Sequence, residues 1–208
     1  MEIDTGIIIQ IHDEIASSYN LNKEMLNVGY LDSIIYSMGY IFRQNVYEEI
    51  FWKASVLFEG IIRKHPFIDG NKRTALATIQ EYLFINGIIF VTPLSAVRFS
   101  IKIASNTHQG EENILQLQES IYRWVKYYSL IKSDESHTKL LKSMINREIK
   151  LIEKIYKLEN NKMGKTNIQC FIDYITGKDI YPSCTYTFES VMEFYKQRLN
   201  WLTEILEL

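Results

Sequence analysis

Residues 65–74 gather side chains that could handle a phosphate ester. Apolar helical segments are expected on either side, at 51–62 and 75–84, so the stretch is a loop that leads into a helix N-terminus. Such a terminus presents unpaired N–H groups and the positive end of the helix dipole, which both favour an anion. The candidate site residues are His65, Phe67, Asp69, Gly70, Asn71, Lys72 and Arg73.

Each of these residue types fits one part of a phosphate-transfer site. His65 can take a proton near neutral pH, which suits a general base. Asp69 has the wrong charge to touch phosphate directly, so its carboxylate indicates a bridging Mg²⁺. Phe67 is the expected buried anchor of the nucleotide-binding loop. Gly70 lets a phosphate approach the backbone, and three donors that could hold it follow: Asn71, Lys72 and Arg73.

A purely structural explanation exists for each residue taken singly. His65 could cap the preceding helix, Asp69 could cap the next one, and Lys72 with Arg73 could be a solvated first turn. These explanations must all hold together to replace the phosphate site. The combination therefore favours chemistry.

The string His-Pro-Phe-x-Asp-Gly-Asn-Lys-Arg at 65–73 resembles the signature of the Fic/Doc (death-on-curing) family. Members transfer part of a nucleotide to a protein hydroxyl. The resemblance extends over roughly residues 3–128 and implies an enzyme that uses ATP with Mg²⁺. It also implies an all-α bundle with a small β flap, which would lie at residues 39–47 and hold the target segment as an added strand. A plain loop explains the same residues.

Two positions indicate a subgroup of this family. AMP-transferring members usually have Gly where this chain has Lys72 and Arg where it has Leu76. Lys72 would crowd the diphosphate of such members, and Leu76 removes the guanidinium that grips it. The chain resembles the Doc-like members better. These pass on the γ-phosphate of ATP, and elongation factor Tu is the known target of the type member.

The resemblance thus implies a toxin that phosphorylates a protein hydroxyl and inhibits translation, with a separate antitoxin as partner. Two alternatives stay open. One is a Fic-type AMP transferase, and the other is a catalytically silent interaction module that keeps the same loop.

Composition narrows the class of protein. The 208 residues are 47% hydrophobic, enough to bury a full core, and the three prolines suit a mostly helical chain. A net charge of −2 gives no reason to expect nucleic acid or an anionic membrane as partner. The two cysteines, Cys170 and Cys184, lack metal-ligand spacing and fit a reduced, cytoplasmic protein. The apolar run at residues 7–9 is too short, and lacks the basic flank, for a signal peptide.

The resemblance implies a Fic/Doc catalytic domain at 1–130, and the change in the character of the sequence after residue 129 predicts a helical extension at 131–208. In the first, helices are expected at 7–18, 31–38, 47–62, 71–86, 97–105 and 114–128, and one opening at Thr92 and Pro93. The first helix should bury Ile7, Ile8, Ile11 and Ile15. His12 and Asp13 lie on that helix, where a surface pair or a satisfied core histidine is expected rather than a catalytic dyad.

The extension is separated from the first domain by a polar linker, expected at residues 133–136. A long helix at 140–156 and another at 188–206 carry apolar stripes, with a short helix at 170–175 between them. These stripes must pack on each other, on the catalytic bundle or on a second copy, and a homo-oligomer through these helices is one of the options.

Some relatives are silenced by a glutamate in a (Ser/Thr)-x-x-x-Glu-(Gly/Asn) helix that pairs with the last Arg of the motif. Leu76 stands at that Arg position, so the glutamate would have no partner. Residues 55–60 match the pattern, but they lie inside the helix that leads to the motif, which indicates coincidence. Residues 185–189 match more loosely.

Overall fold

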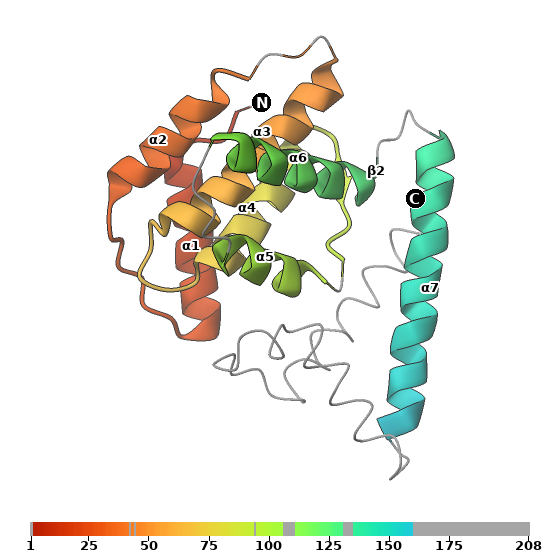
Figure 1. The fold of residues 1–208 in the computed structure, drawn as a ribbon. Helices are drawn as coiled ribbons and strands as arrows, with labels where there is room; N and C mark the ends of the chain where they lie inside the picture. Colours follow the sequence, from red (N-terminus) through yellow and green to blue (C-terminus); the bar gives the residue numbers. More distant parts are fainter. Residues whose placement is uncertain are drawn as a thin grey trace. The chain divides into compact units, whose positions relative to one another are not determined.

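The computed structural model describes residues 2–41, 43, 45–93, 95–105, 111–130 and 135–159. The chain divides into two compact units. The first comprises Met1–Pro93 and Phe99–Ile131, and the second comprises Leu94–Arg98 and Lys132–Leu208. The described helices and strands follow in chain order (Figure 1): α1 Thr5–Tyr19, α2 Val28–Met38, α3 Val46–Lys64, α4 Asn71–Ile85, β1 Ile89–Phe90, α5 Ala96–Ser105, α6 Glu111–Tyr127, β2 Ser129–Leu130 and α7 Glu135–Glu159.

The predicted fold class, a helical bundle with a small β element, is confirmed. β1 and β2 are two residues long and pair antiparallel, with Ile89 opposite Leu130 and Phe90 opposite Ser129. They are the only two strands assigned in the described parts of the chain. β1 lies within the apolar run at residues 88–91.

The expected flap at residues 39–47 is not a strand in the residues described there; Phe42 and Gln44 lie outside them. The chain turns after α2 and enters α3 at Asn45, whose Oδ1 accepts from the N–H groups of Tyr47 and Glu48. The N–H groups of Tyr47 and Glu48 are therefore bonded within the start of α3 and do not pair with a neighbouring strand. The open alternative, a plain loop, describes this stretch better.

Helix α3 is the centre of the first unit and packs against α2, α4 and α6 (Figure 1). It begins about one turn before the apolar stripe and carries Glu48 and Glu49 in its first turn and Arg63 and Lys64 in its last, which suits the helix dipole. Its buried side chains form the middle of the core: Ile50, Phe51, Ala54, Ser55, Val56, Leu57, Phe58, Ile61 and Ile62.

The match of residues 55–60 to an inhibitory helix is explained by packing. A Cβ at Gly60 would lie 2.7 Å from Ile34 Cγ1 of α2, so Gly60 permits the close approach of α2 and α3. Ser55 is buried and donates to the carbonyl of Trp52. Glu59 pairs with Arg63 at 2.9 Å on the same helix. The string is therefore part of the helix packing, as expected.

Helix α1 buries a different stripe from the predicted one. Its fully buried residues are Ile8, His12 and Ala16, one turn apart, whereas Ile7, Ile11 and Ile15 are only partly buried. The face that packs inward is thus centred on His12. An apolar count could not show this, because histidine was assigned to the polar side.

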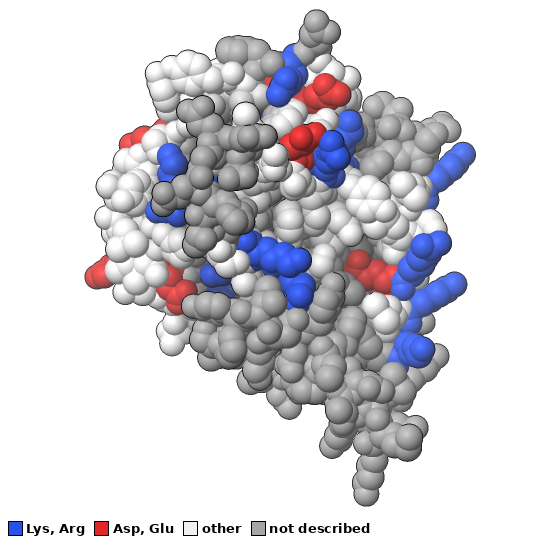
Figure 2. All heavy atoms as spheres, in the orientation of Figure 1, with Lys and Arg blue, Asp and Glu red and all other residues white. Residues whose placement is uncertain are grey.

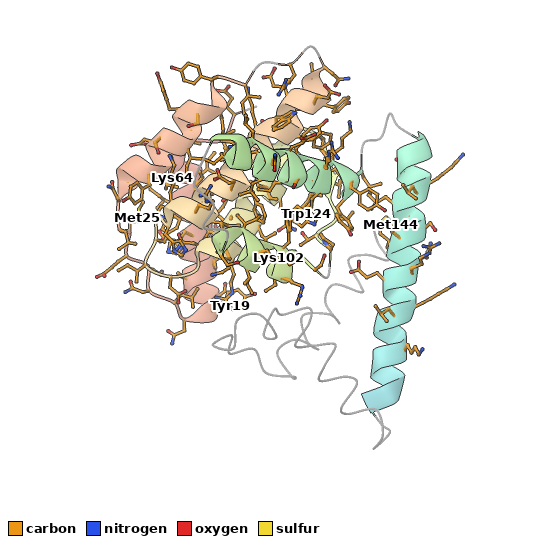
Figure 3. All side chains as sticks on the ribbon, viewed as in Figure 1. Tyr19, Met25, Lys64, Lys102, Trp124 and Met144 are labelled. Carbon is orange, nitrogen blue, oxygen red and sulfur yellow. The ribbon has the colours of Figure 1, made fainter. Side chains whose placement is uncertain are left out.

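The remaining helices of the first unit follow the predictions with shifts at their ends. α4 starts at Asn71 as predicted and gives way to Asn86 and Gly87, the latter with φ +76°. Thr92 and Pro93 do not open a helix, because α5 begins only at Ala96. α6 brings Trp124, labelled in Figure 3, against three aromatic rings, those of Phe58, Phe90 and Phe99.

In the second unit the predicted long helix is α7, which is 25 residues long. It begins at Glu135, so the second half of the expected linker 133–136 is helical. Leu141 and Ile145 of the predicted stripe are buried, while Leu140 is exposed. The predicted helices at 170–175 and 188–206 lie outside the described residues.

Candidate active site

The loop that carries the motif is set by two left-handed residues. His65 ends α3 with φ +48°, and Gly70 precedes α4 with φ +78°. Glycine adopts this conformation freely, whereas histidine does so at a cost, so His65 is held there by its surroundings. The two turns reverse the chain within six residues. His65 and Asp69 stay exposed while Phe67 between them is fully buried.

Asn71 braces this loop from the first turn of α4. Its side chain is 3% exposed, and its Oδ1 accepts from the N–H of Phe67 at 3.0 Å. Its Nδ2 donates to the carbonyl of Phe67 at 2.7 Å and contacts His65 Nδ1 at 3.1 Å. The side-chain donors of Asn71 thus already have acceptors in the loop. The expected phosphate contact of Asn71 is left to its main-chain N–H, which opens α4.

The same network determines the tautomer of His65. The paired bonds to the N–H and carbonyl of Phe67 fix which amide atom of Asn71 is oxygen and which is nitrogen. Nδ2 is therefore the donor toward His65, and Nδ1 of neutral His65 must accept. Its ring proton accordingly lies on Nε2, and the lone pair of Nδ1 accepts the bond from Asn71.

The surroundings of His65 keep its ring neutral. Partial burial lowers its pKa from the ordinary value of 6.5, and the positive charge of Lys72 lowers it further. A neutral imidazole at pH 7 is the form that can accept a proton.

Asp69 is an exposed carboxylate at the tip of the loop, where its Oδ1 accepts from the N–H of Gly70 at 2.6 Å. No group of three or more His, Cys, Asp or Glu side chains able to hold a metal occurs among the described residues. A lone carboxylate with room for water and phosphate oxygens fits Mg²⁺, which usually takes one or two carboxylates in nucleotide sites. The residues present therefore fit the expected metal.

The cationic side chains near the loop are arranged in different ways. Lys72 and Arg73 are partly exposed, and the Arg73 guanidinium lies 4.6 Å from the ring centre of Tyr19 at the end of α1. Arg63 pairs with Glu59, and Lys64 Nζ donates to Ser33 Oγ at 2.7 Å. Arg63 and Lys64, which precede the motif, are thus engaged with other helical residues. Lys72 and Arg73 instead lie in the first turn of α4, where a phosphate would bind.

A segment between α1 and α2, residues 24–26, also belongs to the site. Met25 forms an isolated antiparallel bridge with Phe67. The N–H of Leu26 donates to the carbonyl of Pro66 at 2.8 Å, and the N–H of Ile68 donates to the carbonyl of Glu24 at 3.1 Å. Figure 3 labels Met25 on this segment. Nothing in its composition indicated the pairing, because the partner strand is the motif loop itself.

His12 is the second residue that the structure adds. It is fully buried, stacks on Phe67 with ring centres 3.7 Å apart, and contacts Thr74 Oγ1 through Nδ1 at 3.1 Å. The expected surface pair with Asp13 is thus wrong. The alternative of a satisfied core histidine holds only in part, because Nε2 has no hydrogen bond of normal geometry among the described residues. Its spacing from Ile8 and Ala16 is the sequence signal that could have found it.

Comparison with known families decides the assignment of this region. The model of the Fic/DOC family matches residues 2–83, which span α1 to most of α4 and all seven candidate site residues. The match supports the assignment of this part of the chain to the Fic/Doc family, whose members are transferases. The resemblance predicted from the motif is therefore confirmed for the portion that carries it.

A curated Fic/Doc relative is Toxin Doc of Mycolicibacterium smegmatis, which is 38% identical over 48 residues. The aligned stretch covers 23% of this chain and 37% of that protein, so the match spans little more than a third of the relative's length. No solved structure matches the chain.

The charged side chains of the described residues form no single patch on the face drawn in Figure 2. On the face drawn in Figure 2, Lys and Arg side chains lie in separate groups with Asp and Glu between several of them. None of the helices described has the length and apolar character needed to cross a membrane.

Proposed function

We propose that the chain is a Doc-like toxin that transfers the γ-phosphate of ATP to a hydroxyl of a target protein. The observation that carries this proposal is the pair Lys72 and Leu76 on α4. Both AMP-transferring and Doc-like members share the rest of the motif, so these two positions distinguish the two reactions.

The surroundings of the pair support phosphate transfer. Leu76 is partly buried and packs against the hydrophobic core, so no guanidinium reaches the diphosphate position from there. Lys72 lies close enough to His65 to lower its pKa, which puts a positive charge beside the base. A charge there would stabilise the negative charge that develops on a transferring phosphoryl group.

In the proposed reaction, neutral His65 accepts the proton of the target hydroxyl. The hydroxyl oxygen then bonds to the γ-phosphorus, the bond from that phosphorus to the β,γ-bridging oxygen breaks, and ADP leaves. The lone pair of His65 Nδ1 accepts a hydrogen bond from Asn71, so Nδ1 can take the proton directly only when the hydroxyl displaces that amide. A hydroxyl that approaches Nε2 instead requires the ring to change tautomer first.

The remaining site residues bind and position the nucleotide. The main-chain N–H groups at the start of α4, with Lys72 and Arg73, would hold its phosphates, for which Arg73 must turn from Tyr19. Asp69 would hold Mg²⁺, which when bound neutralises phosphate charge. Phe67 and Gly70 shape the loop around these groups.

The partners follow from the family and from the toxin relative. We propose a cytoplasmic target, with elongation factor Tu as the first candidate and inhibition of translation as the result. A toxin of this kind requires an antitoxin, which we propose is a separate protein.

The test is to find which phosphate of ATP is transferred to protein. Purified chain, elongation factor Tu and Mg²⁺ are incubated in parallel with ATP labelled at the γ- or at the α-phosphate. We expect label on protein from the γ-phosphate only, and none when Mg²⁺ is chelated. Label from the α-phosphate would overturn the kinase assignment in favour of AMP transfer. No transfer to this target or to any protein of a bacterial lysate would favour the silent module.

A further inference from the structure

His12 lies on α1, well before the motif in sequence, yet its ring packs against the motif loop. It occupies the centre of the buried face of α1 and is completely shielded from solvent. Its ring plane lies 11° from that of Phe67, so the two rings stack face to face. Phe67 is itself fully buried. One face of the loop's anchor is therefore covered by a side chain from α1.

A second contact joins the same ring to α4. Thr74 Oγ1, fully buried one turn after Asn71, lies 3.1 Å from His12 Nδ1. The stack fixes how close the ring comes to the loop, and the hydrogen bond fixes its direction within the stacking plane. His12 thus holds the loop and the first turn of α4 at one spacing.

Gly70 shows how tightly this ring is fitted. A Cβ at Gly70 would lie 3.1 Å from Leu21 Cδ1 and 3.4 Å from His12 Cε1. A side chain at Gly70 would be strained at its φ of +78°, and its Cβ would also crowd Leu21 and touch His12. The loop and His12 fit together as one packed group.

These contacts lead from His12 to His65 in three steps. His12 covers the ring of Phe67, the main chain of Phe67 is held on both sides by Asn71, and Asn71 donates to His65 Nδ1. A displaced Phe67 would move the carbonyl and N–H that orient Asn71. The bond that sets the tautomer of His65 would change with them.

Packing alone does not account for a histidine here. His12 Nε2 is buried without a hydrogen bond of normal geometry among the described residues. Besides Thr74, only the backbone of Asn22 there offers the ring a hydrogen bond, so this nitrogen is weakly satisfied, which disfavours the folded state. An apolar ring would fill the same space without that cost, but it would leave Thr74 Oγ1 without this contact. A residue that costs stability at the edge of a site points to a role in the site.

We propose that His12 is a positioning residue, which holds the Phe67–Asn71–His65 network in the arrangement that orients the ring of His65. The expected effect of His12 on the reaction rate rests on the proposed phosphate transfer. Its effect on the protonation of His65 can be tested without any assumption about the reaction.

The variants remove the hydrogen bond from either end. His12→Phe keeps an aromatic stack on Phe67 but cannot bond Thr74, and Thr74→Val removes the hydroxyl with little change in volume. The matched control is Thr78→Val, the same change one turn later on α4, at a buried hydroxyl without a partner among the described residues. The double variant His12→Phe/Thr74→Val removes both polar partners together, which avoids leaving either one unpaired.

The structural readout is the ¹⁵N spectrum of the imidazole rings, which is tractable because the chain has four histidines. In the wild type we expect His65 to be protonated on Nε2. In His12→Phe, Thr74→Val and the double variant we expect the His65 signals to shift or to show both tautomers, while Thr78→Val leaves them unchanged. Unchanged His65 signals in the folded double variant would overturn the inference, whatever the protein transfers.

The kinetic readout is γ-phosphate transfer. We expect the double variant to recover the melting temperature of the wild type but to lose about tenfold or more in kcat, with KM for ATP within about twofold. Wild-type kcat in the double variant would show that His12 only fills space. Absence of transfer in the wild type would instead refute the proposed function, and the ¹⁵N result would still decide the role of His12.

Discussion

At the scale of single residues, the motif side chains have distinct roles: some can contact a ligand, whereas others hold the loop in place. Asn71 acts inside the loop rather than toward a ligand with its side chain, because both Phe67 main-chain groups and His65 Nδ1 occupy its amide. His65 is exposed and neutral, and the proton of its ring is placed by a neighbour. His65 is thus the proposed base, while Asn71 determines which of its ring nitrogens carries the proton.

Replacing His65 tests the base directly. We expect His65→Asn to lower γ-phosphate transfer by about 10² to 10⁴, the usual loss for a positioned general base. Asparagine is chosen because it tolerates the left-handed backbone at this position, with φ +48°. The melting temperature should stay near that of the wild type, since His65 is exposed. Wild-type rates in this variant would show that another group takes the proton, and growth arrest on expression should disappear with the activity.

The pH dependence of the rate tests the surroundings of His65. A base must be neutral, and both burial and Lys72 lower its pKa from 6.5, so kcat/KM should stay high until the pH falls below 6.5. In Lys72→Met the positive neighbour is absent, and the acid limb should move to higher pH even though the rate itself falls. A plot of kcat/KM against pH for both proteins checks this. An acid limb that is the same in both would exclude Lys72 as a cause.

At the scale of helices and strands, the loop is held by elements that come both before and after it. α1 supplies the ring that covers Phe67, and residues 24–26 pair with the backbone of 66–68. α3 and α4 supply the two ends of the loop and pack on each other. α2 then packs against α3 at Gly60, which sets how close these two helices come.

That close approach can be tested by adding one methyl group. Gly60→Ala would gain helix propensity, but its Cβ would meet Ile34 Cγ1 at 2.7 Å, so one side chain or helix must shift. We expect a net loss of about 1–2 kcal/mol in the free energy of unfolding, measured by urea denaturation. The double variant Gly60→Ala/Ile34→Ala should lose less than the sum of the two single changes. Strict additivity would show that the two residues do not conflict.

At the scale of the whole molecule, the chain has a first unit that the Fic/DOC family model matches over residues 2–83 and a second unit that the match does not cover. The predicted division at 130/131 remains a prediction as a domain boundary. A cut near Tyr128 would remove β2, whose Leu130 pairs with Ile89. The first unit reaches Ile131, which is the better end point for a shortened chain.

A chain that ends at Ile131 distinguishes an inhibitory tail from a tail used in packing. We expect it to transfer γ-phosphate at about the rate of the full chain, because the Glu-based inhibition of relatives has no partner at Leu76 and a separate antitoxin is proposed. Light scattering on both chains shows whether the second unit forms a homo-oligomer. A soluble shortened chain with sharply higher activity would instead make the tail the inhibitor.

The sequence by itself determined the helices and the limits of the motif loop. Apolar periodicity located α3 and α4, and Gly70 followed by donors marked the start of α4 at Asn71, because these signals lie within a few residues of the structure they specify. Only the tertiary structure decided that His12 stacks on Phe67, that Met25 bridges Phe67, and that Arg73 lies over Tyr19. These contacts join residues some 40 to 55 positions apart, and the packing of whole helices, which local patterns do not encode, brings them together.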